Sequence, residues 1–192
     1  FTAAELSPQG ATYYIWGSTA GPFTTMGSKL ATLVSPVNES IWTTEVSNSA
    51  VLTNGAHVGH ASISTNELPR ILPASLISVQ LVAYCSRADR TLRPILEIYE
   101  SDQTTLVGRF IGTTSTLPTS EANIRFDISV DTETVITDAD RQILMYFELV
   151  DGWQDSPGNE TLYVYSQDGK LTYLQLPQSS GVYVSQGEMT IF

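Results

Sequence analysis

Two histidines stand three residues apart in the first third of the chain, as His57-Val58-Gly59-His60. Closely spaced histidines serve as metal ligands, but a structural zinc site takes four ligands and a catalytic one commonly three. The chain has a single cysteine, Cys85, and side chains three positions apart on a strand point to opposite faces. The sequence therefore predicts no metal site at this pair.

The chain offers no context for a nucleophilic hydrolase. Its serines are abundant, yet none stands in the G-x-S-x-G elbow that presents a nucleophile to a histidine. Two carboxylates at a fixed separation can hydrolyse a glycosidic bond, but the sequence does not give that separation. We expect no enzyme and predict no catalytic residue.

Acidic residues gather in the loops beside predicted strands, where carboxylate oxygens can bind Ca²⁺. The Asp138-x-Asp140 pair lacks the glycine and the bidentate glutamate of an EF-hand loop, and a solvated acidic rim explains the same residues. We predict no cofactor and keep calcium as an alternative. The loop carboxylates are Asp131, Glu133, Asp138, Asp140, Asp151, Asp155 and Glu160.

Aromatic residues near the C-terminal end offer a binding chemistry, because flat rings stack on sugar rings. Trp153 lies in a segment rich in turn residues, and Tyr163 and Tyr165 share one face of a strand whose other face holds Leu162 and Val164. Trp153, Tyr163 and Tyr165 are therefore the candidate glycan contacts. Ordinary packing against a sheet edge or a second subunit is the alternative.

The first 54 residues differ in character from the rest and carry more aromatic residues than a loose tail needs. We predict an N-terminal arm with extra strands over residues 1–54, acting as a docking segment, and a β-sandwich domain over residues 55–192. The aromatic residues are expected to pack on this domain or on a neighbouring copy. The candidate partner contacts are Tyr13, Tyr14, Trp16, Phe23 and Trp42.

The amino-acid composition of the chain limits the classes of partner that it can bind. With 20 acidic and 9 basic residues the net charge is −11, and nucleic-acid binding needs clustered lysine and arginine. No stretch approaches the roughly 18 apolar residues of a membrane-spanning helix. We therefore expect neither a nucleic acid nor a membrane as partner. The 192 residues and 42% hydrophobic content suit one compact β domain.

The stretch Ile71–Tyr99 organises the predicted fold. Apolar residues recur at every second position of its first half, the pattern of a half-buried strand, and its second half alternates again after a polar turn. We expect these two strands to pair as antiparallel neighbours. The apolar row of the first strand is Ile77, Val79, Leu81, Ala83 and Cys85, so that Cys85 is predicted to be a buried, inert thiol.

Eight short strands with turn residues between them follow Gly55, which indicates an all-β fold. They are expected near Val58–Ser64, Leu76–Cys85, Arg93–Tyr99, Leu106–Gly112, Ile124–Val130, Gln142–Val150, Leu162–Tyr165 and Tyr173–Leu176. We predict an antiparallel, jelly-roll-like β-sandwich with an extended N-terminal arm. Further buried rows are Leu96/Ile98, Ile124/Phe126/Ile128/Val130 and Ile143/Met145/Phe147/Leu149.

The segment 55–176 contains a Leu-Pro element at Ile71-Leu72-Pro73, a strand of the type LRPILEIYE, and the segment DADRQILMYFEL after a Thr/Ser-rich stretch and an alternating strand. With these elements in this order it resembles a jelly-roll β-sandwich module of tailed-bacteriophage virion proteins. The Asp140-Arg141 pair that opens a strand of alternating hydrophobic residues is its most recognisable piece.

This resemblance implies a non-enzymatic bacteriophage virion structural protein, on the particle surface, as a head decoration or cement protein or a fibre component. It implies virion proteins of the capsid or tail as partners and self-association into a homo-oligomer. A carbohydrate-binding or receptor-binding module of a tail fibre, with a glycan as partner, is the alternative.

Overall fold

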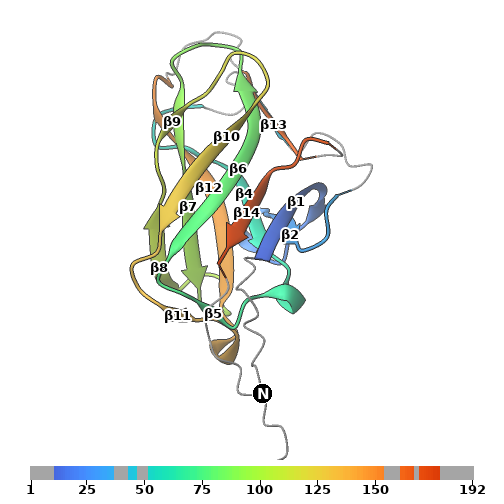
Figure 1. The fold of residues 1–192 in the computed structure, drawn as a ribbon, viewed down its shortest axis with the longest axis vertical. Helices are drawn as coiled ribbons and strands as arrows, with labels where there is room; N and C mark the ends of the chain where they lie inside the picture. The colour runs from blue at the N-terminus through green and yellow to red at the C-terminus, as the bar shows by residue number, and fades with distance from the viewer. Residues whose placement is uncertain (1–10, 37–42, 47–51, 154–160, 167–168, 178–192) are drawn as a thin grey trace, which may run out of the picture.

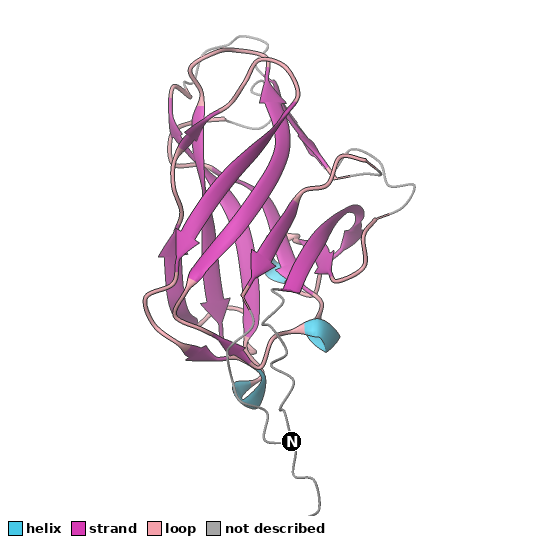
Figure 2. Cartoon of the chain, viewed as in Figure 1, coloured by secondary structure: helices cyan, strands magenta, loops and turns pink. Residues whose placement is uncertain are grey.

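The computed structural model describes residues 11–36, 43–46, 52–153, 161–166 and 169–177. Over these residues the fold is all-β, as predicted, and the helices are three short 3₁₀ turns (Figure 2). These turns are η1 (Thr24–Met26), η2 (Thr65–Glu67) and η3 (Thr137–Ala139). Within the described ranges no helix is long and apolar enough to cross a membrane.

The strands lie close to where the alternation of the sequence placed them. The first seven are β1 (Ala11–Ala20), β2 (Lys29–Thr32), β3 (Thr43–Val46), β4 (His57–Ile63), β5 (Ile71–Leu72), β6 (Leu76–Cys85) and β7 (Thr91–Tyr99). The others are β8 (Leu106–Ile111), β9 (Ser115–Thr116), β10 (Ala122–Ser129), β11 (Thr134–Val135), β12 (Gln142–Asp151), β13 (Thr161–Tyr165) and β14 (Tyr173–Leu176).

One hydrogen-bonded sheet folds over to form the two layers of the sandwich (Figure 1). The front layer contains β10, β6, β13, β14, β3 and β1, and the back layer contains β4, β12, β7 and β8. Strand β2 joins the layers, since it pairs antiparallel with β1 and parallel with β4. On the opposite side a single bridge between Gly112 and Ile128 connects the segment after β8 to β10.

Strand β6 is the centre of the front layer. It pairs with β10 along most of its length on one edge and with β13 and then β14 on the other. The expected pairing of β6 with β7 is wrong, because β7 pairs with β12, β8 and β9 in the back layer. The polar segment between the two strands crosses from one layer to the other instead of closing a hairpin.

The hydrophobic core lies between the layers and consists of the predicted rows. The buried rows of β6, β7, β10 and β12 face one another, and Cys85 is buried among them, as predicted. Phe126 of β10 and Phe147 of β12 pack across the core with ring centroids 5.9 Å apart. Strand β10 alternates buried and exposed side chains most cleanly, because its outward residues Arg125 and Asp127 would lose their hydration in a core.

The expected boundary at residue 54 does not separate an arm from the sandwich. Strand β1 pairs with β14 and β2, and Ile15 at its centre is fully buried in the common core. The described residues before 54 therefore belong to the sandwich fold itself. Residues 1–10, 37–42 and 47–51 of the predicted arm lie outside the described residues.

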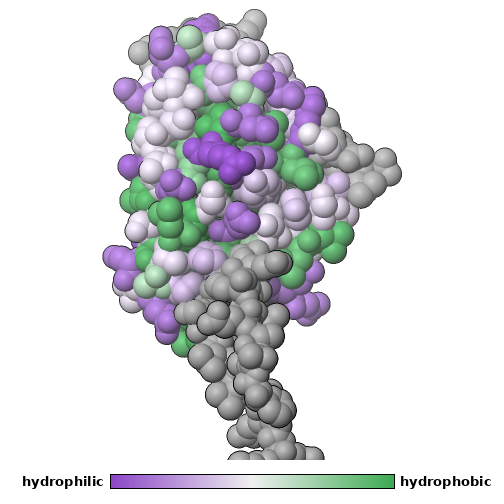
Figure 3. Space-filling model, in the orientation of Figure 1, coloured by the Kyte–Doolittle hydropathy of each residue, from purple (hydrophilic) through white to green (hydrophobic). Residues whose placement is uncertain are grey.

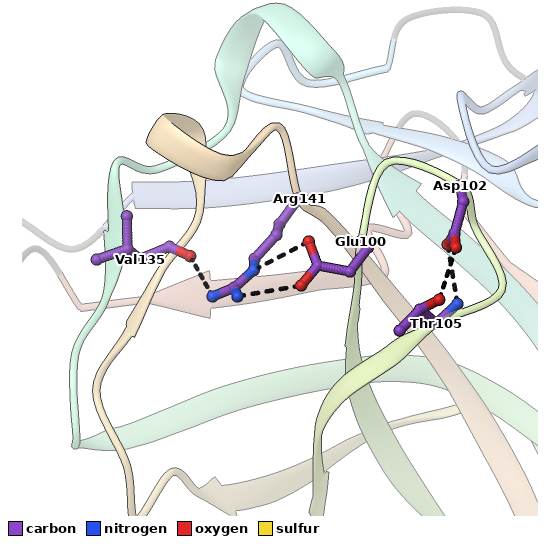
Figure 4. A network of polar contacts seen from close by, with 5 residues as sticks. All are labelled: Glu100, Asp102, Thr105, Val135 and Arg141. Atoms are coloured by element: carbon purple, nitrogen blue, oxygen red, sulfur yellow. Dashed lines mark hydrogen bonds and ion pairs between the residues drawn. The ribbon is translucent and has the colours of Figure 1, made fainter.

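The Asp140-Arg141 pair has a structural explanation (Figure 4). Asp140 takes the left-handed conformation, with φ of 53°, that ends η3. Arg141 then donates hydrogen bonds to both carboxylate oxygens of Glu100, at 3.1 and 3.4 Å, and to the carbonyl oxygen of Val135 at 3.1 Å. The arginine thus fastens the start of β12 to the end of β7.

Candidate functional site

The outer face of the back layer contains a buried carboxylate, Glu97 of β7, which is 1% exposed. It accepts hydrogen bonds from the hydroxyl groups of Tyr99 at 2.6 Å and Tyr146 at 2.9 Å. The guanidinium group of Arg109 donates from Nε at 2.6 Å and forms an ion pair through Nη2 at 2.5 Å. We call Glu97, Tyr99, Arg109 and Tyr146 the Glu97 cluster.

The phenols of the Glu97 cluster are held in the protonated form. Burial, followed by the hydrogen bond to Glu97, raises the pKa of Tyr99 to about 12. Burial and Glu97 likewise raise the pKa of Tyr146. Both hydroxyl groups therefore donate to Glu97 at neutral pH, and its carboxylate is fully engaged by neighbours. Such a carboxylate stabilises the fold but is poorly placed to act as a general base.

A bulge in β4 brings the two histidines to the same face. Gly59 adopts a φ of 65°, and the register of β4 against β12 shifts by one residue between Val58 and Ala61. The rings of His57 and His60 therefore both lie against Tyr146, with centroid distances of 4.4 and 5.2 Å. The prediction that they point to opposite faces is wrong, because an inserted residue resets the alternation of a strand.

The histidine pair is packed against an aromatic ring. Burial lowers the pKa of His60, and the neighbouring His57 lowers it further, while Glu97 acts in the opposite direction. Among the described residues there is no group of three or more His, Cys, Asp or Glu side chains that could hold a metal ion. Asp155 and Glu160 of the calcium alternative lie outside the described residues.

The outer face of the front layer carries the second group of functional candidates, which we call the tyrosine face. It is formed by Tyr84 of β6, Tyr163 and Tyr165 of β13, Tyr173 of β14 and Tyr14 of β1, all of them partly exposed. Figure 3 views the molecule from this side and shows hydrophilic residues over the middle of the face with paler residues around them.

Three rings of the tyrosine face stack on one another. Tyr84 and Tyr163 face each other across β6 and β13, with centroids 4.5 Å apart and ring planes 15° apart. Tyr165 lies 6.2 Å from Tyr84 at 18°. Its hydrogen bond with Tyr84 raises the pKa of the Tyr84 phenol. The ring faces that these tyrosines turn towards each other are therefore closed to a ligand.

Polar groups border this stack. The ammonium group of Lys170 lies 4.8 Å from the centroid of the Tyr165 ring and pairs with Glu121 at 2.7 Å. The Tyr173 hydroxyl donates to Gln80 at 3.2 Å, and the Tyr173 ring meets Tyr14 edge-on at 5.8 Å. The tyrosine face therefore combines an aromatic centre with a polar margin, the composition of many protein interfaces.

The structure corrects three of the predicted contact residues. Tyr13 is 2% exposed and donates a hydrogen bond to the carbonyl oxygen of Glu67, and Phe23 is fully buried against Tyr99. Trp153, a candidate glycan contact, is 2% exposed and its indole N–H donates to the carbonyl oxygen of Thr91 at 2.7 Å. These three rings are buried inside the protein, because burial of a large aromatic side chain strongly stabilises the folded state.

The other candidates are distributed over the surface. Tyr14 and Trp16 are partly exposed, and the Trp16 indole donates to the carbonyl oxygen of Val34. Tyr163 and Tyr165 lie on the tyrosine face, whereas Trp42 lies outside the described residues. Sequence reasoning missed Tyr84, although it stands between the buried Ala83 and Cys85 and so had to point outward.

A small pocket lies between the start of β1 and the end of β14. Its volume is about 260 Å³, and Tyr13, Leu33, Pro69 and Leu176 are among its lining residues. The carboxylate of Glu67 in its wall already accepts hydrogen bonds from the Thr32 hydroxyl at 2.5 Å and the Leu33 N–H at 2.8 Å. The polar groups of this pocket thus serve the fold.

Comparisons with known proteins relate the fold to hydrolases. No protein-family model matches the chain, and no curated protein matches it in sequence. A solved α-amino acid ester hydrolase matches with a TM-score of 0.57 and 12% identity, over 88% of this chain and 36% of that one. An aminopeptidase from a marine sediment Thaumarchaeota archaeon matches with a TM-score of 0.44 and 11% identity, over 88% and 33%. The chain thus spans about a third of these proteins.

These comparisons correct the expected function. The ester hydrolase shares the sandwich fold, so this fold is not specific to bacteriophage particles. The assignment as a non-enzymatic virion structural protein, whether decoration protein or tail-fibre module, is therefore overturned. At 12% identity the match shows the fold alone.

Proposed function

We propose that this chain is a non-catalytic β-sandwich module that works beside the catalytic domain of a hydrolase and contacts it through the tyrosine face. The lengths of the two proteins support this proposal, because this chain matches only 36% of the ester hydrolase with the same fold. A sandwich of this kind is therefore compatible with being one part of a larger molecule.

The observation that carries the proposal is the stack of Tyr84, Tyr163 and Tyr165. Tyrosine is enriched at protein interfaces, since its ring supplies contact area and its hydroxyl group supplies a hydrogen bond. Half-exposed aromatic rings on a sheet face gain free energy when a partner removes them from water. Neither the core nor the Glu97 cluster uses these three rings, which leaves them available for a partner.

A protein fits this surface better than a sugar does. A sugar ring stacks on the open face of an aromatic ring, but Tyr84 and Tyr163 are 4.5 Å apart and nearly parallel, which leaves no space between them. Lys170 lies over the ring of Tyr165. The surface consequently offers ring edges and hydroxyl groups, which suit the mixed apolar and polar contacts of a protein interface.

The chemistry of the other face supports a non-catalytic role. The carboxylate of Glu97 is occupied by three donors, and His57 and His60 rest on the Tyr146 ring. In this arrangement neither imidazole activates a nucleophile.

A hydrolysis assay tests this part of the proposal. The purified chain is incubated with p-nitrophenyl acetate, an α-amino acid methyl ester and an aminoacyl p-nitroanilide. We expect no turnover above that of buffer. Turnover that disappears in H57Q or H60Q would overturn the proposal and assign catalysis to the histidine pair.

A binding assay tests the contact. The catalytic domain that accompanies this chain, in the same polypeptide or in a second one, is mixed with the wild-type chain and with the Y84S/Y163S variant. The Y84S/Y163S variant lacks two aromatic rings that the complex would bury, so its dissociation constant should rise about tenfold or more. The control is I111S, because Ile111 is an exposed hydrophobic residue of β8 outside the tyrosine face.

Three results would contradict the proposed contact between the tyrosine face and a catalytic domain. Equal binding by wild type and Y84S/Y163S would exclude the tyrosine face. Self-association in sedimentation that is lost in this variant would make a second copy of the chain the occupant, in line with the homo-oligomer predicted from the sequence. Retention on a polysaccharide that is lost in the variant would make the occupant a glycan.

A further inference from the structure

The histidine pair lies at a bulge in the back layer, in strand β4 where it pairs with β12. Strand β4 is the link through which the back layer continues into β2 and the front layer. Its pairing with β12 is interrupted at the bulge, between the Val58–Phe147 and Ala61–Met145 pairs. A bulge leaves a residue without ladder hydrogen bonds, which favours local opening at this place.

We propose that His57 and His60 form an acid-sensitive latch, which holds β4 against β12 while both imidazoles are neutral and releases it when they are protonated. In the neutral form the two rings cover Tyr146, whose side chain is 2% exposed. Leu144, fully buried beside it, belongs to the small hydrophobic cluster of this face with Phe23, Ile95, Tyr99 and Tyr146. Opening of the latch would uncover this cluster.

The carboxylates near the latch are already paired with arginines. Glu97 is paired with Arg109, and Glu148, which lies opposite His57 on β12, is paired with Arg93 at 2.6 Å. The two negative charges of the carboxylates thus cancel the two positive charges of the guanidinium groups. The titratable groups around the pair are Tyr146 and Glu148 from β12, Arg93, Glu97 and Tyr99 from β7, and Arg109 from β8. Lys29 of β2 pairs with Ala61, whose side chain lies on the core side of β4.

Protonation of both rings therefore adds two positive charges to a balanced site. Each imidazolium gains some attraction from the Tyr146 ring, but one ring serves both cations, and the cations repel each other. Burial also disfavours the charged form of His60, which agrees with the direction of its pKa. His57 is already exposed, so the cost of charging the pair falls on the partly buried His60, and this cost is relieved when the strand end moves into water.

Hydrogen exchange of the whole chain, compared at pH 7.5 and pH 5.0 after correction for intrinsic rates, tests the latch. In the wild type we expect the protection of residues 57–63 and 144–149 to fall about tenfold or more at pH 5.0, because the folded strand binds protons less readily than the opened one. In the H57Q/H60Q variant the fall should be less than about threefold. Protection of β10 should stay constant and serves as the internal control.

Two results would overturn the proposal. An equal loss of protection in H57Q/H60Q would assign the acid response to other groups, such as the carboxylates. An unchanged wild type would exclude the latch altogether. If the double variant does not fold, the single variant H57Q and a proton NMR titration of His60 replace it, and titration of His60 at or above pH 6.5 would equally exclude the latch.

Discussion

The two outer faces of the sandwich use the same residue, tyrosine, in opposite ways. On the back layer the phenols of Tyr99 and Tyr146 point at the buried carboxylate of Glu97 and are almost inaccessible to water. On the front layer Tyr84 and Tyr163 stack on each other and remain half-exposed. The neighbouring residues explain the difference. On the back layer the phenols donate their hydrogen bonds to a buried carboxylate, whereas among the described residues of the front layer no buried carboxylate accepts them and the rings stay accessible to a partner.

Removal of the Glu97 carboxylate should have the largest effect. In E97A the guanidinium group of Arg109 and two buried phenols lose their partner, and breaking one side of a buried ion pair costs about 3 to 5 kcal/mol. We expect the free energy of unfolding in urea to fall by about this amount. Y163S on the opposite face should cost less than about 1 kcal/mol. A larger loss in Y163S than in E97A would reverse the comparison.

Alkaline pH should destabilise the back layer first. The folded-state pKa of Tyr99 is raised from 10 to about 12, so the unfolded chain loses this proton earlier than the folded chain does. The stabilisation is complete below pH 10 and is lost as the pH rises from 10 to 12, by about 1 to 2 kcal/mol.

Thermal unfolding of wild type and Y99F between pH 8 and pH 11.5 measures this loss. Y99F should be less stable at pH 8 but less sensitive to alkali. Parallel curves for the two proteins would mean that other phenols account for the alkaline response.

Substitution at the bulge should have a smaller effect. Gly59 has a φ of 65°, and an alanine held in this left-handed conformation costs about 1 kcal/mol. G59A should therefore lower the free energy of unfolding by about that amount while the tyrosine face stays intact. The nuclear Overhauser effects from His57 and His60 to Tyr146 should weaken. If they persist at full strength in a protein of unchanged stability, the glycine is not what aligns the rings.

The smallest effect is expected for a single hydroxyl group on the open face. Y84F removes the hydrogen bond between Tyr84 and Tyr165 but keeps the stacked ring. Its urea midpoint should match that of the wild type, because solvent replaces the lost hydrogen bond at an exposed site. Y99F is the matched deletion on the closed face and should shift the midpoint clearly. Equal shifts would show that the two faces are alike in energy.

Local patterns in the sequence predicted the strands well. The bounds of β6 and β14 agree with the prediction, because alternation along a strand reflects only which side faces the core. The pairing of β6 was not predictable in this way, since its partners come from residues 122–129 and 161–176. Strand order depends on contacts that no short window contains.

The site residues were harder to predict for a related reason. A single inserted residue at Gly59 places both histidines on the same face of β4, where opposite faces were expected. The spacing of the histidines in the sequence does not indicate this bulge. Trp153 follows an Asp-Gly turn and looked exposed, yet its indole fills the core. Glu97 reads as a solvent-facing residue of a strand, and its burial follows from Tyr99, Arg109 and Tyr146 around it.

The central place of β6 also bears on how the chain reaches its native state. Gln80 on this strand meets Tyr173, 93 residues further along, so the last neighbour of β6 emerges late in synthesis. A nascent chain that stops before β13 exposes one whole edge of its most apolar strand, which invites pairing with other chains. High contact order of this kind predicts slow folding and a need for protection on the ribosome.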